Sequence, residues 1–245
     1  DARLGGVCLN RGCIPSKALI HALDLVAEAE ISKKRGIHFP DPRINLNELR
    51  EWKDGVIERL AGGVQGLARK RKIEQIRGRG YLEDNETLRV EDADGNQRYL
   101  AFRRLILATG SRSALPSALD IGNPRVMTSK EALQLPDIPE KLLVVGAGYI
   151  GMELGTVYAR LGSNVTLVEA LERVLPEADA ELARIPQRRV KKAFADIRVN
   201  TEIGSLETAG EQVLATLVDR DSGDTRDALF DRVLVSVGRQ PNSDG

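Results

Sequence analysis

The stretch Leu142–Glu153, which reads LLVVGAGYIGME, combines an apolar strand, a glycine-rich turn and the start of a helix. A G-x-G-x-x-G match alone is weak evidence, since glycines recur in many turns. Here the strand before it and the helical spacing of apolar residues after it make the match specific. In such a turn Gly146 permits the tight bend, Gly148 leaves room for a pyrophosphate, and Gly151 allows helix and strand to pack closely. The sequence therefore predicts a dinucleotide-binding βαβ unit.

Glu169 ends the next apolar strand, Val165–Val168. It lies at about the distance from the glycine turn at which such units place an acidic ribose ligand. A carboxylate there accepts hydrogen bonds from both ribose hydroxyls and repels a 2′-phosphate, so we expect NAD rather than NADP. The alternative is a strand-end charge exposed to solvent, which the neighbouring glycine motif disfavours.

The chain has only two cysteines, Cys8 and Cys13, in the segment GGVCLNRGCIPSK that begins at Gly5. A disulfide closing so small a loop stabilises a fold by only about 2 kcal/mol, so a redox role explains the pair better than a structural one. Pro15 suits the first turn of a helix, and apolar residues follow it at helical spacing. Cys13 would then lie at the helix start, where unpaired N–H groups favour a thiolate. Buried reduced thiols and half of a metal site are the alternatives; no third or fourth soft ligand lies nearby, and we expect no metal.

The two halves of the chain repeat one order of elements. Helices are expected at 15–31 and 46–70, with strands at 74–76, 87–90, 98–102 and 105–107; the second half has strands at 142–145, 165–168, 213–218, 226–230 and 233–237. Each half ends in a meander, an apolar strand and a glycine. We predict an α/β fold of two Rossmann-like dinucleotide-binding domains, the first one incomplete. The expected limits are 1–116, 117–238 and a return segment at 239–245; the alternative is a single sheet with irregular loops.

Composition excludes some functions. Lysine plus arginine equals aspartate plus glutamate at 36 each, which does not indicate nucleic-acid or membrane-surface binding. The apolar stretches are too short for a membrane span, and no signal peptide opens the chain. Two cysteines do not make a secreted disulfide scaffold, and we expect a cytoplasmic location.

The cysteine segment resembles, almost residue for residue, the redox-active segment of the flavin-dependent pyridine nucleotide–disulfide oxidoreductases, and within that family the dihydrolipoamide dehydrogenases. The resemblance implies that Cys13 lies against the flavin as the charge-transfer thiolate, while Cys8 exchanges with the dithiol substrate. It also places Lys17 near the flavin and pairs it with Glu153. The cofactors implied are FAD and NAD.

The resemblance extends along the whole chain and implies two sets of cofactor-binding residues. The positions matched to FAD contacts are Gly5, Gly6, Lys17, Gly80, Thr109, Gly110 and Ser111. Those matched to NAD contacts and to the return to the flavin domain are Gly146, Gly148, Tyr149, Ile150, Gly151, Glu153, Glu169, Ile203, Gly238 and Arg239.

The implied activity is oxidation of dihydrolipoamide, carried on a lipoyl domain, to lipoamide with NAD⁺. The implied partners are a second copy in a homodimer and the core of a 2-oxo acid dehydrogenase complex. The chain is expected to be truncated at both ends, with the family's catalytic histidine outside it, since neither His21 nor His38 lies in a matching motif. The isolated chain would then be inactive. The alternatives are a glutathione or mercuric reductase, or a non-catalytic NAD-binding module.

Overall fold

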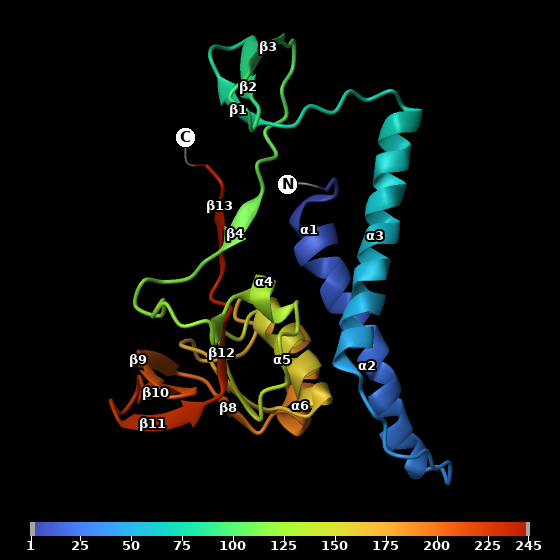
Figure 1. Cartoon of the computed structure of the whole chain (residues 1–245). Coiled ribbons are helices and arrows are strands. Elements are labelled where there is room, and N and C mark those ends of the chain that lie inside the picture. Colours follow the sequence, from blue (N-terminus) through green and yellow to red (C-terminus); the bar gives the residue numbers. More distant parts are fainter. Residues whose placement is uncertain (1–2, 244–245) are drawn as a thin grey trace.

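The computed structural model describes residues 3–243, and its centre is a five-stranded parallel sheet in the order β5–β12–β6–β7–β8 (Figure 1). The strands are β5 (Val126–Met127), β12 (Arg232–Val235), β6 (Lys141–Val145), β7 (Asn164–Val168) and β8 (Asp196–Arg198). β6 lies in the middle and has a parallel neighbour on each side. This position explains its unbroken apolar sequence, because a central parallel strand is covered on both faces. The predicted strands at 142–145 and 165–168 are confirmed.

Alternate side chains of β6 enter two different cores. Leu142 and Val144 belong to one core with the helices α5 (Tyr149–Leu161) and α6 (Ala180–Ala193). Leu143 and Val145 pack on the other face, against an antiparallel meander. The meander consists of β9 (Thr201–Ala209), β10 (Gln212–Asp219) and β11 (Thr225–Phe230). The sheet is therefore a middle layer between helices and a second sheet.

Three helices from the first part of the chain stand beside this unit (Figure 1). They are α1 (Gly6–Arg11), α2 (Cys13–Lys33) and α3 (Leu46–Lys70). α2 packs on both α3 and α5. Its fully buried Leu19 and nearly buried Leu23 lie in the same core as Leu142.

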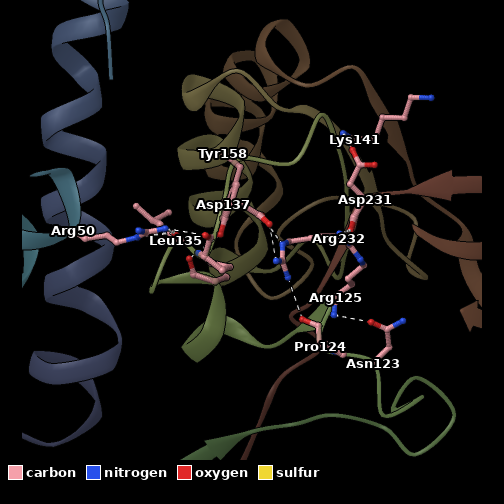
Figure 2. A network of polar contacts seen from close by, with 12 residues as sticks. Arg50, Asn123, Pro124, Arg125, Leu135, Asp137, Lys141, Tyr158, Asp231 and Arg232 are labelled. Carbon is pink, nitrogen blue, oxygen red and sulfur yellow. Dashed lines mark hydrogen bonds and ion pairs between the residues drawn. The ribbon is translucent and has the colours of Figure 1, made fainter. Parts of the chain in front are cut away.

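Polar contacts fasten α3 to the loop before β6. Arg50 donates from Nε to the carbonyl oxygen of Leu135 at 2.8 Å, and from a terminal nitrogen to that of Pro136 at 2.8 Å. Lys53 donates to the carbonyl oxygen of Leu133 at 3.0 Å. Figure 2 shows Arg50 reaching Leu135, with the Asp137–Arg232 ion pair beyond it. The loop thereby joins α3 to the first residue of β12, Arg232.

The remaining elements lie away from the parallel sheet. β1 (Arg79–Leu82), β2 (Thr87–Glu91) and β3 (Gln97–Ala101) form a separate antiparallel sheet beyond the end of α3 (Figure 1). β4 (Ser111–Ser113) pairs with β13 (Arg239–Pro241) in a two-stranded ribbon. The short helix α4 (Ser129–Ala132) follows β5. No helix among residues 3–243 is long and apolar enough to cross a membrane.

Two predicted strands are wrong. Residues 74–76 and 105–107 have no strand structure, and the side chain of Ile106 is 90% exposed. A strand requires a neighbour to hydrogen-bond with, and none of the described strands pairs with either segment. The predicted α/β fold is confirmed, and the one parallel sheet of the described residues belongs to the second half of the chain. The division near residue 117 stays a prediction, although the α2 leucines share the core of the second half.

We expect Leu19→Ala to lower the free energy of unfolding by about 2–5 kcal/mol, because it opens a cavity where α2 meets α5. Leu25→Ala is the matched control on the same helix, since that side chain is 69% exposed. It should change stability by less than about 0.5 kcal/mol. Urea unfolding followed by circular dichroism measures both. Equal losses would contradict this packing.

Candidate functional site

The glycine turn between β6 and α5 has the close contacts that its sequence predicts. A Cβ atom on Gly151 would lie 2.0 Å from the carbonyl oxygen of Gly146, so only glycine fits there. Gly146 has φ of +96°, a left-handed conformation that favours glycine. A Cβ atom on Gly148, by contrast, would meet no atom within 4 Å. The space at Gly148 beside the helix N-terminus fits a dinucleotide pyrophosphate.

Glu169 lies next to this turn, at the end of β7, and is 8% exposed. One of its carboxylate oxygens accepts a hydrogen bond from the backbone N–H of Ala147 at 2.7 Å. The other accepts from the N–H of Leu171 at 3.0 Å. The alternative of a solvent-exposed charge is therefore wrong for this residue.

The two cysteines meet where α1 ends and α2 begins. Cys13 is the first residue of α2, as predicted, and its side chain and that of Cys8 are both exposed. The two cysteines are not joined here but are hydrogen-bonded to each other, and the redox disulfide stays a prediction. The Cys8 S–H donates to the Cys13 sulfur, which raises the pKa of the Cys8 thiol, while the charge of Lys17 acts in the opposite direction.

Lys17 and Glu153 form the ion pair that the sequence predicts. The Lys17 Nζ atom lies 2.7 Å from one carboxylate oxygen of Glu153 and 2.9 Å from the other. Ser16, which is 5% exposed, donates its hydroxyl proton to the same carboxylate at 2.9 Å. The side chains of Lys17 and Glu153 are 58% and 29% exposed, so the ion pair is only partly buried. The pair connects α2 with α5.

A cavity of about 250 Å³ joins these groups. Its walls include both cysteines, Lys17 and Glu153, together with Tyr149 from the start of α5 and Arg239 from β13. Arg239 donates to the Ser111 hydroxyl at 2.8 Å and to the Ser111 carbonyl at 2.7 Å, and Ser111 also lines the cavity. The thiols therefore share one cavity with the first turns of α5.

The other predicted residues lie at varying places around this cavity. Ile150 lines it, and Gly5 and Gly6 precede or begin α1. Asn242 binds the carbonyls of Thr109 and Gly110, and the Gly238 carbonyl accepts from Ala114. Two positions lie in other sheets. Gly80 lies in β1 of the separate sheet, and Ile203 lies in β9 of the meander.

Sequence reasoning missed two serines. Ser16 holds Glu153, and the Ser236 hydroxyl donates to the carbonyls of Val145 and Gly146 at 2.9 and 3.0 Å. Ser16 lies within the cysteine motif, so the motif could have indicated it as a site residue. Ser236 follows β12 with no motif of its own. Among residues 3–243, no group of three or more metal-ligating side chains is placed to hold an ion.

The fold and the site define a protein with a Rossmann-type nucleotide-binding unit set beside a pair of thiols. Residues 2–245 match the family model of pyridine nucleotide-disulphide oxidoreductases, and the chain belongs to this family. Enzymes of this family use FAD and a pyridine nucleotide, which agrees with the predicted cofactors.

Known relatives extend the match. The chain is 40% identical to dihydrolipoyl dehydrogenase of Haemophilus influenzae over 98% of its length, and 40% identical to that of Geobacillus stearothermophilus. It spans about half the length of each. Among solved structures, LpdA from Mycobacterium tuberculosis superposes with a TM-score of 0.86 at 27% identity, over 99% of this chain and 52% of LpdA. The flavoprotein disulfide reductase RclA from Escherichia coli superposes with a TM-score of 0.80 at 26% sequence identity, over 99% of this chain and 50% of RclA.

Exchanging two glycines for alanine should separate binding from folding. Gly148→Ala should change the free energy of unfolding by less than about 1 kcal/mol, because its Cβ has open space and φ is −68°. It should weaken NAD binding roughly tenfold or more, because the methyl group occupies the pyrophosphate position. Gly151→Ala should cost about 3 kcal/mol of stability, since backbone must move. Calorimetric titration and thermal unfolding measure these effects; unchanged NAD affinity in Gly148→Ala would place the nucleotide elsewhere.

Proposed function

We propose that this chain supplies the redox cysteines and the NAD-binding unit of a dihydrolipoamide dehydrogenase. The observation that carries the proposal is the shared cavity, in which Cys8 and Cys13 face the Lys17–Glu153 pair at the start of α5. The 40% identity to dihydrolipoyl dehydrogenases supports this activity over others in the family.

The thiol chemistry is a disulfide exchange. In the oxidised pair, a thiolate of dihydrolipoamide attacks the Cys8 sulfur, the Cys8–Cys13 bond breaks, and its electrons leave with Cys13 as a thiolate. The second substrate thiol then displaces Cys8, which closes the lipoamide disulfide and transfers two electrons to the cysteines. The helix N-terminus at Cys13 stabilises the leaving thiolate.

Two separate groups of residues would hold the two cofactors. The cysteine cavity, with Gly5, Gly6, Lys17 and the segment Thr109–Ser111, fits a flavin, and the turn at Gly148 with Glu169 fits NAD. Bound FAD would accept the electron pair from the dithiol and pass it as hydride to NAD⁺. The protein's own part is to hold the thiols, to place Lys17 through Glu153, and to fix the glycine turn.

The same proposal includes the wider setting. Dihydrolipoamide would arrive on a lipoyl domain, and the whole protein would act as a homodimer in a cytoplasmic 2-oxo acid dehydrogenase complex. The name of the relatives supports the substrate. A reducing compartment suits cysteines that cycle between dithiol and disulfide.

A second candidate is another disulfide reductase, such as a glutathione or mercuric reductase, and the likeness to RclA favours keeping it. Turnover of dihydrolipoamide against glutathione by the full-length protein distinguishes the two. The third candidate, a non-catalytic NAD-binding module, predicts nucleotide binding without flavin absorbance or turnover.

The cysteines should differ in their effect on the spectrum of the flavin-loaded, full-length protein. Two-electron reduction should produce a long-wavelength thiolate-to-flavin absorbance. Cys8→Ser should keep this band with oxidised flavin, because Cys13 remains as thiolate, whereas Cys13→Ser should abolish it. The reverse pattern would exchange the two roles. Absence of the band from the unmodified protein would contradict the proposed function.

Glu169→Ala should reduce the preference for NAD over NADP, since the repulsion of a 2′-phosphate is removed. NAD affinity itself should fall by roughly 1.5–3 kcal/mol with the loss of a charged hydrogen-bond acceptor. Glu172→Ala is the matched control, an exposed carboxylate three positions along the same loop. Calorimetry with both nucleotides measures the ratio. Equal affinity of the unmodified protein for NAD and NADP would disprove this role.

A further inference from the structure

The Glu169 carboxylate is engaged with the protein before any nucleotide is considered. Its two oxygens accept the N–H groups of Ala147 and Leu171 at 2.7 and 3.0 Å, and the residue is buried. The Ala147 amide belongs to the glycine turn itself, so this bond ties the carboxylate to the turn as well as satisfying it. We propose that Glu169 is also a positioning residue, whose bond to Ala147 orients the glycine turn toward the phosphates. This rests on the proposed binding of NAD at the turn.

Ala147 is held from two directions by the segment that follows β7. Besides the bond from its N–H to Glu169, its carbonyl oxygen accepts the N–H of Leu175 at 2.9 Å. The side chain of Ala147 is fully buried. The peptide groups on both sides of Ala147 therefore cannot rotate without breaking a buried hydrogen bond.

The neighbouring residue, Gly146, is fixed as well. Its N–H donates to the Val168 carbonyl at 2.8 Å, and its own carbonyl accepts the Ser236 hydroxyl at 3.0 Å. With Gly146 and Ala147 held, the direction of the chain is set at Gly148, where α5 begins and a Cβ atom would meet open space. Of these bonds, only those of Glu169 and Ser236 come from side chains, so they are the ones that substitution can remove.

Both roles are compatible with one carboxylate. An ionised carboxylate has about four lone-pair positions. The two backbone bonds use one on each oxygen, which leaves one on each oxygen for ribose hydroxyls. Glu169 would thus bind the ribose with the same carboxylate that holds the turn. A substitution of Glu169 would therefore weaken phosphate binding as well as ribose binding.

The test uses two ligands that differ only in the ribose hydroxyls, ADP and 2′,3′-dideoxy-ADP. Their affinities for the 245-residue chain are measured by calorimetry in the unmodified protein, in Glu169→Gln and in the control Glu172→Gln. Glutamine keeps the size of the side chain but replaces one acceptor oxygen by an NH₂ group, so one buried N–H loses its partner. Removing the negative charge by itself favours an anionic ligand, so the charge change cannot imitate the expected loss.

If Glu169 positions the turn, Glu169→Gln lowers the affinity for dideoxy-ADP by at least about fivefold, the smallest effect expected for an unpaired buried donor. The control stays within about twofold. If Glu169 serves the ribose alone, only ADP is weakened and dideoxy-ADP is unchanged, which overturns the proposal.

A second readout does not depend on nucleotide binding. Amide hydrogen exchange of Ala147 and Leu171 should be slow in the unmodified protein and at least tenfold faster for one of them in Glu169→Gln, which loses one acceptor oxygen. If the exchange rates of both amides are unchanged in Glu169→Gln, the positioning role is overturned, even where neither ADP nor dideoxy-ADP binds. Failure of both nucleotides to bind the unmodified protein, with exchange changed as expected, would reject the proposed NAD site and leave the positioning of the turn intact.

Discussion

The close approach of α5 to the end of β6 is the contact on which the rest of the site depends. A side chain at Gly151 would collide with the carbonyl oxygen of Gly146, so the helix can start directly above the strand only because both residues are glycine. One turn later, Gly155 allows a different close contact: a Cβ atom there would lie 2.8 Å from the ring of Phe194, which follows α6. The position of α5 then determines where its first turn lies and in which direction the side chain of Glu153 points.

Apolar packing, rather than the ion pair, brings the thiols to this helix. Lys17 and Glu153 are partly exposed, and such pairs typically contribute about 0–1 kcal/mol. The buried leucines of α2 contribute several times more at the same interface. Packing therefore sets the distance between α2 and α5, while the ion pair and Ser16 set the orientation of two side chains.

The parts that sequence predicts well are those set by near neighbours along the chain. The glycine turn, the start of α2 at Cys13 and the acidic end of β7 each follow from a short motif whose geometry is local. The Lys17–Glu153 pair spans most of the chain and became predictable only through resemblance to a family. The strands expected at 74–76 and 105–107 failed because strand formation depends on partners that an apolar run cannot specify. The sequence does not indicate Ser236 for the same reason, since its role depends on the parallel pairing of β12 with β6.

The contacts of Glu169 show why a motif can identify a site residue and still describe it incompletely. Its offset from the glycine turn predicts the ribose role, because that role depends on where β7 ends. Its bond to Ala147 depends instead on how the loop after β7 folds back over the turn, with Leu175 reaching the same residue. Both interactions draw on a single buried carboxylate, which is costly to bury unless hydrogen-bonded. The N–H groups of Ala147 and Leu171 meet that requirement, so the carboxylate is already oriented for the ribose hydroxyls that we propose it binds.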